Sequence, residues 1–335
     1  MRILIRIILF FLISYSITIA QRTLPTTENF NYTVGSELRN VGQDWTRISG
    51  TANDLLVVNG NLSYSGYPMP TEGNMIEIKY NGTDDVKLSF NAVNNDKIYA
   101  ALLVNLYSNT GLSASGVYFV SLGSGTSNYY TRIWVRTTNS GNTFNFGLSR
   151  NSNTITWSSS DFNFNQTYLI VLDYEFVSGS ANDIVKLWVN PDLSGNEPSP
   201  LISTNQNGTA DATSIDGFMV RQASGGPNTY IDAIRIGTAW DDAPLPVQIN
   251  NFNYSKTNNI IYLQWQTATE VNNYGFEIER KYSGPADVIN NNWEKIGFVQ
   301  GNGNSNSPKH YSFIDKNLLS GYYSYRLKQI DYDGK

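Results

Sequence analysis

The chain has 335 residues, no cysteine and a single histidine, and its formal net charge is −5. Without cysteine it can form neither disulfides nor thiolate-based zinc sites, so burial and sheet hydrogen bonds must stabilise the fold. A weakly acidic chain without a basic run offers nothing to the phosphate backbone of nucleic acids or to anionic lipids, so no nucleic-acid partner is expected.

The N-terminal segment predicts export. Arg2 and Arg6 form a basic start, Ile7–Ile13 is an apolar run, and Thr18 to Ala20 resembles a signal-peptide cleavage site. The alternative is an uncleaved anchor, but a spanning helix needs about 20 apolar residues, more than this run supplies. We therefore expect 1–20 to be a cleaved signal peptide that leaves no membrane span. The mature protein is expected to be secreted or at the cell surface, via the periplasm and outer membrane.

Residues 21–242 are predicted to form one large β-sandwich. Short alternating segments are separated by Gly-, Ser- and Asn-rich turns, and no amphipathic helix lies between them. Val86–Phe90 alternates apolar and polar residues, whereas Tyr99–Tyr107 is almost continuously apolar and predicts a strand covered on both faces. Further strands are expected at 117–122, 131–136, 143–148, 168–176, 183–189 and 230–236.

A proline-rich linker is predicted at 243–248, and a smaller β module at 249–335. Leu263-x-Trp265 places a tryptophan on the inner face of its second strand, and Tyr323-x-Tyr325-x-Leu327 alternates as in immunoglobulin-like sandwiches. A seven-stranded sandwich would need one more strand after Gly334, so we expect this module to be truncated. Its strands are expected at 247–254, 260–267, 276–282, 293–300, 310–315 and 322–331.

The smaller module resembles a known bacterial domain through the segments Thr267–Lys281, Trp293–Phe313 and Gly321–Gly334. It is similar to the fibronectin type III-like domain that precedes the C-terminal sorting domain of proteins exported by the type IX secretion system. The resemblance implies a spacer placed before a sorting domain, contact with the type IX secretion machinery, and attachment to or release from the cell surface.

The larger domain resembles the concanavalin A-like, laminin-G-like jelly rolls of exported proteins. The resemblance implies a fold rather than an activity, because this fold hosts lectins, glucanases and structural domains alike. The expected fold class is all-β, a two-sheet jelly-roll sandwich followed by a smaller immunoglobulin/fibronectin type III-like sandwich. The segments that carry the resemblance are Glu28–Phe30, Gly35–Leu38, Arg132–Arg136, Phe144–Leu148, Tyr168–Val171, Leu187–Pro191 and Ile231–Gly237 with Trp240.

Catalysis is not expected. His310, the only histidine, lies in the smaller module, so the larger domain has no imidazole for a Ser-His-Asp or Cys-His site. We expect His310 to be an ordinary strand residue. The nearest approach to a glycosidase pair is Asp173-x-Glu175, whose carboxylates would project about 7 Å apart from one strand face. The alternative is that this pair lies opposite Lys186 as an ion pair.

A candidate ligand-binding face lies on one strand, where strict alternation puts Tyr130, Arg132, Trp134 and Arg136 on the same side. Aromatic rings offer flat platforms for sugars, and guanidinium groups bind hydroxyls or carboxylates. On another strand, alternation puts Lys186 and Trp188 on the same side, where they would form a similar pair. The alternative is that these side chains only cover an exposed sheet or pack under a loop.

A structural Ca²⁺ is the one cofactor that the sequence suggests. Extracellular jelly rolls carry such an ion between their first and last strands, held by oxygen ligands. Glu28 and Asp232 stand where such ligands would come from, whereas Asp84-Asp85 and Asp241-Asp242 fit solvated turns.

These patterns predict an exported, non-catalytic surface or extracellular protein whose jelly roll recognises a glycan or another surface component. Two alternatives stay open. One is a purely structural or adhesive surface protein without a small-molecule site, and the other is a polysaccharide-acting hydrolase that uses Asp173 and Glu175.

Overall fold

The computed structural model describes residues 21–41, 44–50, 55–65, 67, 73–193, 196–206, 209–243, 249–267, 270–283, 292–305 and 308–331. The predicted signal peptide and 244–248 of the predicted linker lie outside these ranges. Within them the regular structure is β-strand apart from the short 3-10 helices η1 (Leu38–Asn40), η2 (Asn139–Gly141) and η3 (Trp240–Asp242), which confirms the all-β prediction. None of the described segments is a helix long and apolar enough to cross a membrane.

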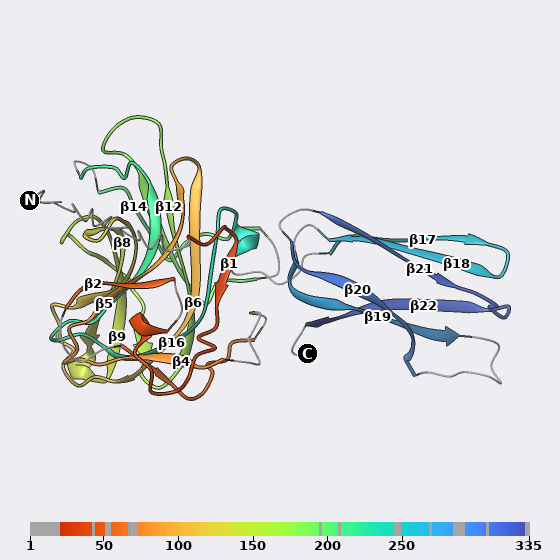
Figure 1. The fold of residues 1–335 in the computed structure, drawn as a ribbon, viewed down its shortest axis with the longest axis horizontal. Helices are drawn as coiled ribbons and strands as arrows, with labels where there is room; N and C mark the ends of the chain where they lie inside the picture. The colour runs from red at the N-terminus through yellow and green to blue at the C-terminus, as the bar shows by residue number, and fades with distance from the viewer. Residues whose placement is uncertain are drawn as a thin grey trace, which may run out of the picture.

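Two antiparallel sheets of eight strands form the larger sandwich (Figure 1). Sheet I runs in the order β14 (Ile202–Thr204), β13 (Ile184–Val189), β12 (Thr167–Glu175), β6 (Lys97–Ser108), β16 (Asn228–Gly237), β4 (Met75–Ile78) and β3 (Leu56–Val58), and β1 (Thr26–Glu28) also pairs with β16. Sheet II runs in the order β10 (Thr156–Trp157), β9 (Thr143–Arg150), β8 (Asn128–Thr138), β7 (Val117–Ser124), β15 (Ile215–Arg221), β5 (Asp85–Val93) and β2 (Trp45–Ser49), and β11 (Phe162–Asn163) also pairs with β9.

The main core lies between the facing sides of sheets I and II. Alternate residues of each strand point into it, such as Leu102 and Val104 on β6 and Phe144 and Phe146 on β9, all fully buried. The ring of Tyr168 on β12 packs edge-on against Phe146, with centroids 5.9 Å apart, and so joins the two sheets. This arrangement is the two-sheet jelly-roll sandwich that the sequence predicts.

Sheet I is also covered on its outer face. Tyr99 and Leu103 on β6 belong to a second buried cluster together with Trp240 of η3. Leu62 and Tyr67, from the segment between β3 and β4, are part of the same cluster. Strand β6 is therefore buried on both faces, as its continuous apolar run predicts.

A smaller sandwich follows. Sheet III consists of β17 (Ile249–Thr257), β18 (Ile260–Thr267) and β21 (Lys309–Asp315), and sheet IV of β20 (Glu294–Ser305), β19 (Glu270–Ser283) and β22 (Tyr322–Asp331). Trp265 on β18 is buried between these sheets, where its ring stacks on Tyr311 and packs edge-on against Phe276. The prediction of an inward tryptophan at this position is confirmed.

The hydroxyl of Tyr174 on β12 offers a test of this packing. Tyr174 is fully buried, donates to Asp183 Oδ2 at 2.6 Å and accepts from the Ala212 backbone N–H at 2.7 Å. Tyr174→Phe leaves both partners buried without the hydroxyl, so we expect a loss of about 2–4 kcal/mol in the free energy of unfolding, measured by urea denaturation. The exposed Tyr254→Phe serves as control and should change it by less than about 0.5 kcal/mol. A loss of less than about 0.5 kcal/mol in the free energy of unfolding of Tyr174→Phe would contradict the prediction.

Candidate functional site

The outer face of sheet II carries a row of aromatic and arginine side chains. Tyr118 on β7 lies opposite Trp134 on β8, and Trp134 lies opposite Gly147 on β9, which in turn pairs with Trp157 on β10. A Cβ at Gly147 would approach a ring atom of Trp157 to 2.6 Å, so this glycine leaves the space that the indole occupies. We call Tyr118, Trp134 and Trp157, with the arginines described next, the aromatic–arginine face.

Three guanidinium groups stack on these rings. Arg132 and Arg221 lie over the ring of Tyr118 at 5.1 and 4.3 Å from its centroid. Arg136 lies over the ring of Trp157 at 4.4 Å. These distances are those of cation–π contacts. The five side chains of the two stacks are all partly exposed, so their outer edges meet solvent.

The charge on this face is only partly balanced. Arg132 donates to the backbone of Tyr129 and Ser152 and to the side chains of Asn151 and Asn153, and none of these acceptors is a carboxylate. Burial of the guanidinium lowers the pKa of Arg132, and the electrostatic interaction with Tyr118 partly offsets this lowering.

Asp85 is the carboxylate that faces Arg221, with 3.9 Å between its Oδ2 and the arginine Nε. Burial raises the pKa of Asp85, although hydrogen bonds from Ser49 and Tyr129 act in the opposite direction. The expectation that Asp84-Asp85 forms a solvated turn is wrong, because both side chains are buried. Asp84 forms an ion pair with Arg47, which anchors the start of β5.

The structure places Arg132, Trp134 and Arg136 on the predicted face, but Tyr130 does not lie there. Between Leu122↔Thr131 and Gly123↔Tyr129 the pairing of β7 with β8 slips by one residue. Such a β-bulge shifts the alternation, so Tyr130 packs against the main core and meets the ring of Tyr174 edge-on. Tyr129 takes its place on the outer face, where its ring lies 5.6 Å from that of Tyr118.

Trp188 is not available to a ligand either, and its predicted role is wrong. Its side chain is 1% exposed and packs against Tyr99 and Trp240 in the outer cluster of sheet I. Its indole N–H donates to the carbonyl oxygen of Pro198 at 2.8 Å. The segment that follows β13 therefore covers the ring that the sequence suggested as a platform.

Asp173 and Glu175 form an ion-pair cluster rather than a glycosidase pair. Asp173 pairs across the strands with Lys186, accepts its backbone N–H at 2.7 Å, and lies 3.6 Å from its Nζ. Lys186 also forms an ion pair with Glu175. Asp173 is fully buried, and burial raises its pKa to about 7 against the opposing effect of Lys186. Its carboxyl group therefore does not face a substrate.

Glu28 and Asp232 do not come together as a calcium site. Glu28 pairs with Ile234 on the core side of sheet I and accepts hydrogen bonds from Phe30 N, Arg22, Tyr32 and Trp45. Asp232 pairs with Leu103 and lies on the opposite side, under Leu62. In the described ranges no group of three or more acidic or histidine side chains converges as metal ligands would.

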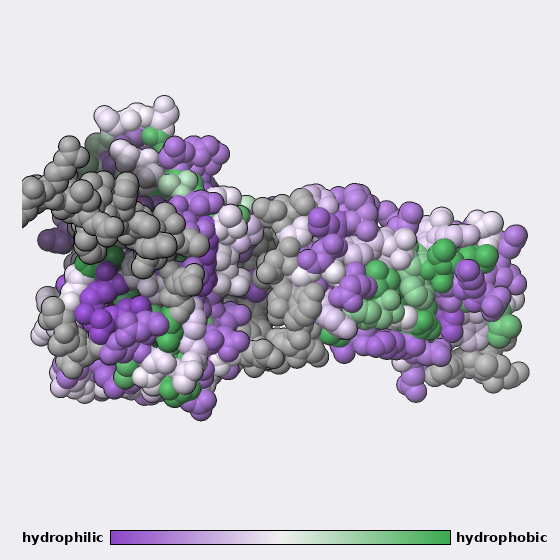
Figure 2. Space-filling view, viewed as in Figure 1, coloured by the Kyte–Doolittle hydropathy of each residue, from purple (hydrophilic) through white to green (hydrophobic). Residues whose placement is uncertain are grey.

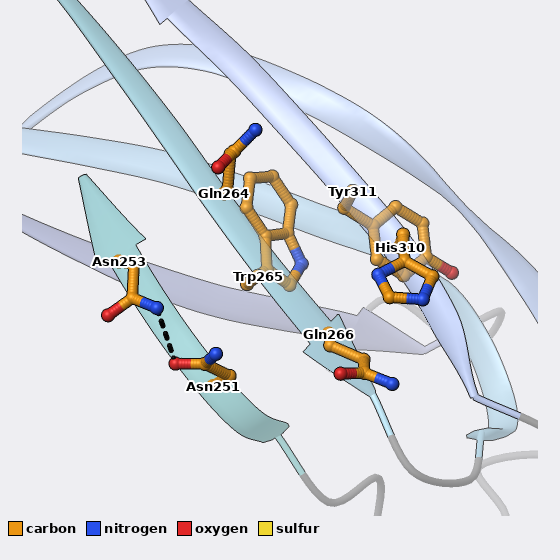
Figure 3. Close-up of a pocket in the computed structure, with 7 residues that line it drawn as sticks. All are labelled: Asn251, Asn253, Gln264, Trp265, Gln266, His310 and Tyr311. Atoms are coloured by element: carbon orange, nitrogen blue, oxygen red, sulfur yellow. Dashed lines mark hydrogen bonds between the residues drawn. The ribbon is translucent and has the colours of Figure 1, made fainter. Parts of the chain in front are cut away.

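The single histidine lines a hollow of about 240 Å³ on the smaller sandwich (Figure 3). His310 is an exposed residue of β21 opposite Gln266. The hollow offers the amide hydrogen-bond donors and acceptors of its asparagine and glutamine side chains, together with one imidazole. Its lining contains no carboxylate, so it supplies no acid–base pair. The other residues that line it are Asn251, Asn253, Gln264, Trp265 and Tyr311.

No protein-family description and no curated protein sequence matches this chain. Among solved structures, the T. cruzi calreticulin globular domain is 11% identical with a TM-score of 0.38 over 64% of this chain and 88% of that one. Lectin II from Ulex europaeus is 10% identical with a TM-score of 0.35 over 63% and 97%. The potassium-bound Emp46p carbohydrate recognition domain is 9% identical with a TM-score of 0.33 over 61% and 93%. Likenesses this distant carry no function to this chain.

Asp232 makes the stability of the larger sandwich depend on pH. It is fully buried and accepts hydrogen bonds from the backbone of Leu62 and Ala233, and burial raises its pKa to about 7. Because the unfolded carboxyl ionises near pH 4, the native state binds the extra proton, and stability is lost as the pH rises from about 4 through 7.

We expect the Asp232 carboxyl group to lower the free energy of unfolding of the wild-type protein by on the order of 3–4 kcal/mol over this pH range. This contribution should be missing from Asp232→Asn. Urea denaturation between pH 4 and pH 8 measures it as the difference between the two stability profiles. Parallel profiles would contradict the assignment to Asp232.

Proposed function

We propose that this chain is an exported, non-catalytic binding protein whose larger sandwich recognises an acidic glycan on the outer face of sheet II. The stack of Arg132, Tyr118 and Arg221 carries the proposal, because two guanidinium groups lie over one ring, at 5.1 and 4.3 Å from its centroid. Such a stack holds two cations in fixed positions beside a partly exposed aromatic ring. The ring offers apolar contact to a sugar, and the guanidinium groups match its acidic groups.

The free donors of the arginines favour an acidic ligand over a neutral one. Arg221 reaches the Tyr118 carbonyl oxygen through Nη1 at 3.4 Å, and Arg136 reaches Asn145 Oδ1 through Nε and Nη2. A guanidinium carries five N–H donors, so in the described structure both groups keep donors for a ligand. Their planar forks match carboxylate and sulfate oxygens, and such charge-assisted hydrogen bonds are stronger than neutral ones.

The remaining parts of the proposal rest on the sequence. Residues 1–20 would direct the chain into the export pathway, which leads through the periplasm and outer membrane to the cell surface or the medium. The smaller sandwich would act as a spacer, and by its resemblance to fibronectin type III-like modules it would belong to a protein handled by the type IX secretion machinery. No structural calcium ion is part of the proposal, since Glu28 and Asp232 lie on opposite sides of sheet I.

One observation favours the alternative of a purely structural or adhesive surface protein. Trp134 is only 8% exposed, and its indole N–H is already bonded to Ser149 Oγ at 2.8 Å. The segment 151–153 also holds Arg132. Part of the face is therefore satisfied internally, so Arg132 contributes its positive charge while Arg136 and Arg221 supply the hydrogen-bond donors for a ligand.

Polysaccharide binding tests the proposal directly. We expect the mature protein to bind polygalacturonate, a carboxylated glycan, and not the neutral pullulan, as measured by affinity electrophoresis and calorimetry. Arg221→Gln and Arg136→Gln should each weaken binding by about 10- to 100-fold, because each removes charge-assisted hydrogen bonds worth about 1.5–3 kcal/mol. Binding should also weaken with added salt.

Arg39→Gln is the matched control. Arg39 also lies on the larger sandwich but pairs with Glu37 outside the aromatic–arginine face, so its variant should bind like wild type. Equal binding of the acidic and neutral polysaccharides, or wild-type affinity in Arg221→Gln, would reject the proposed site. Absence of any binding by the folded protein would favour the structural alternative.

A further inference from the structure

The face of sheet III that points away from sheet IV carries no charged side chain in the described ranges. Its outward residues alternate along the strands with core residues such as Leu263, Trp265 and Tyr311. None of them is an aspartate, glutamate, lysine or arginine. They are Asn251, Asn253, Ser255 and Thr257 on β17, Ile260, Tyr262, Gln264 and Gln266 on β18, and His310, Ser312 and Ile314 on β21.

The outer face of sheet IV is built in the opposite way. There Glu277 of β19 forms an ion pair with Lys295 of β20, and Glu279 of β19 forms one with Arg326 of β22. Sheets III and IV are the two layers of the smaller sandwich in Figure 1, and in the same view Figure 2 shows hydrophobic residues gathered between hydrophilic ones. The two outer faces of one small sandwich therefore attract different ligands, because only sheet IV offers charge to a partner.

The hollow of about 240 Å³ lies at the polar end of the sheet III face (Figure 3). One row across the strands joins Asn251, Gln266 and His310. The next row joins Asn253 and Gln264. The protein uses few of the hydrogen-bonding groups in these rows. Asn253 Nδ2 donates to Asn251 Oδ1 at 2.7 Å. The side chains of Gln264, Gln266 and His310 make no hydrogen bond within the part of the chain that the structure describes.

These groups favour an uncharged ligand. Each side-chain amide offers a carbonyl oxygen as acceptor and two N–H donors, and a neutral imidazole has one donor and one acceptor nitrogen. A carboxylate or ammonium group in the hollow would lose hydration without meeting an opposite charge, which costs free energy. The hollow is smaller than the roughly 300–1,000 Å³ of a site for a drug-sized molecule, so it has room for one unit of a larger ligand.

An acetamido group matches the hollow. It is planar and uncharged, its N–H donates and its carbonyl oxygen accepts, so it can pair with a side-chain amide as two backbone amides pair in a sheet. Its methyl group is apolar, and the aromatic residues Trp265 and Tyr311 also line the hollow. A hydroxyl group forms hydrogen bonds but has no apolar part. The neutral carbohydrates that carry acetamido groups are those built from N-acetylated amino sugars.

We propose that the outer face of sheet III binds an uncharged glycan of N-acetylated amino sugars, with one acetamido group in the hollow. Gln264 and Gln266 form hydrogen bonds with that group, and Asn251, Asn253 and His310 contact the hydroxyl groups of the same sugar unit. The neighbouring units lie along the rest of the uncharged face. This site is separate from the aromatic–arginine face, and its ligand is neutral where the ligand of that face is acidic. Pullulan, which is neutral but has no acetamido group, is a ligand of neither face.

The imidazole of His310 reports on this site, because the chain has no other histidine. Its ring protons can be followed by NMR on mature protein that is labelled only at histidine and carries no purification tag. We expect tetra-N-acetylchitotetraose to shift these resonances at millimolar concentrations. Cellotetraose has the same backbone linkage with hydroxyl groups in place of the acetamido groups. It should bind at least about 10-fold more weakly, because it leaves amide groups of the hollow unpaired.

The variant Gln264→Ala/Gln266→Ala should bind tetra-N-acetylchitotetraose about 10-fold or more weakly than wild type, because it removes the hydrogen bonds to the acetamido group. Gln300→Ala is the matched control, since Gln300 is an exposed glutamine of β20 outside the hollow, and it should bind like wild type. Circular dichroism checks that both variants are folded.

His310 resonances that do not respond to the acetylated sugar would overturn the proposal. Equal affinity for cellotetraose, or wild-type affinity in the double variant, would do the same. Polygalacturonate should leave the His310 resonances unchanged, because its proposed site is on sheet II. The failure of one site can therefore be told from the failure of the other.

Discussion

The burial of sheet I on both faces is the constraint from which the rest of the larger sandwich follows. Its inner face packs on sheet II, and its outer face packs under segments that include Leu62, Tyr67 and Trp240. Polar groups on this outer face are thereby removed from water and must find partners in the protein. Asp232 holds the backbone of Leu62 in this way, and the Tyr67 hydroxyl donates to the Ala233 carbonyl oxygen at 2.7 Å. On sheet II, by contrast, Tyr118, Arg136 and Arg221 stay partly exposed, and the proposed ligand surface lies there.

Alternation predicted the strands well where the pairing is regular and failed where it slips. The continuous apolar run in β6 correctly predicted a strand that is buried on both faces, and Ile133 and Val135 face the core as expected. The bulge that turns Tyr130 inward leaves no trace in the sequence, because residues 129 and 130 are both tyrosine. The bulge in β16 does leave one, since Ile231 and Ile234 both face the core although they are three residues apart. That spacing indicates a change in the alternation between Ile231 and Ile234, and the face of Glu28 follows only from its pairing with Ile234.

The periodicity of the sequence does not show which outward-facing side chains are covered by loops. Trp188 has the outward position that alternation gives it, but a segment about ten residues further on closes over its ring and accepts its N–H. Asp173 and Lys186 face each other as the hairpin predicted, but the full burial of the Asp173 carboxyl group does not follow from that pairing. The aromatic–arginine face was predicted only in part, because Tyr118, Trp157 and Arg221 come from three other strands. These residues become neighbours through the order of the strands in the sheet, and the alternation within a single strand does not reveal that order.

A fold without disulfides requires another way to fix its chain ends and corners, and buried ions with several partners provide it. Arg150 at the end of β9 is fully buried, donates to backbone carbonyls in the segment 205–210, and pairs with Asp211. Glu28 joins β1 to Arg22 and Trp45, and Glu270 in the smaller sandwich joins Thr267, Asn273 and the Asn302 backbone. Each of these charges is stable only when all its partners are present, since a buried ion that loses one is left uncompensated. The arginines of the aromatic–arginine face differ from these buried ions, because their protein partners leave hydrogen-bond donors over at partly exposed positions, and this difference is the basis of the proposed binding surface.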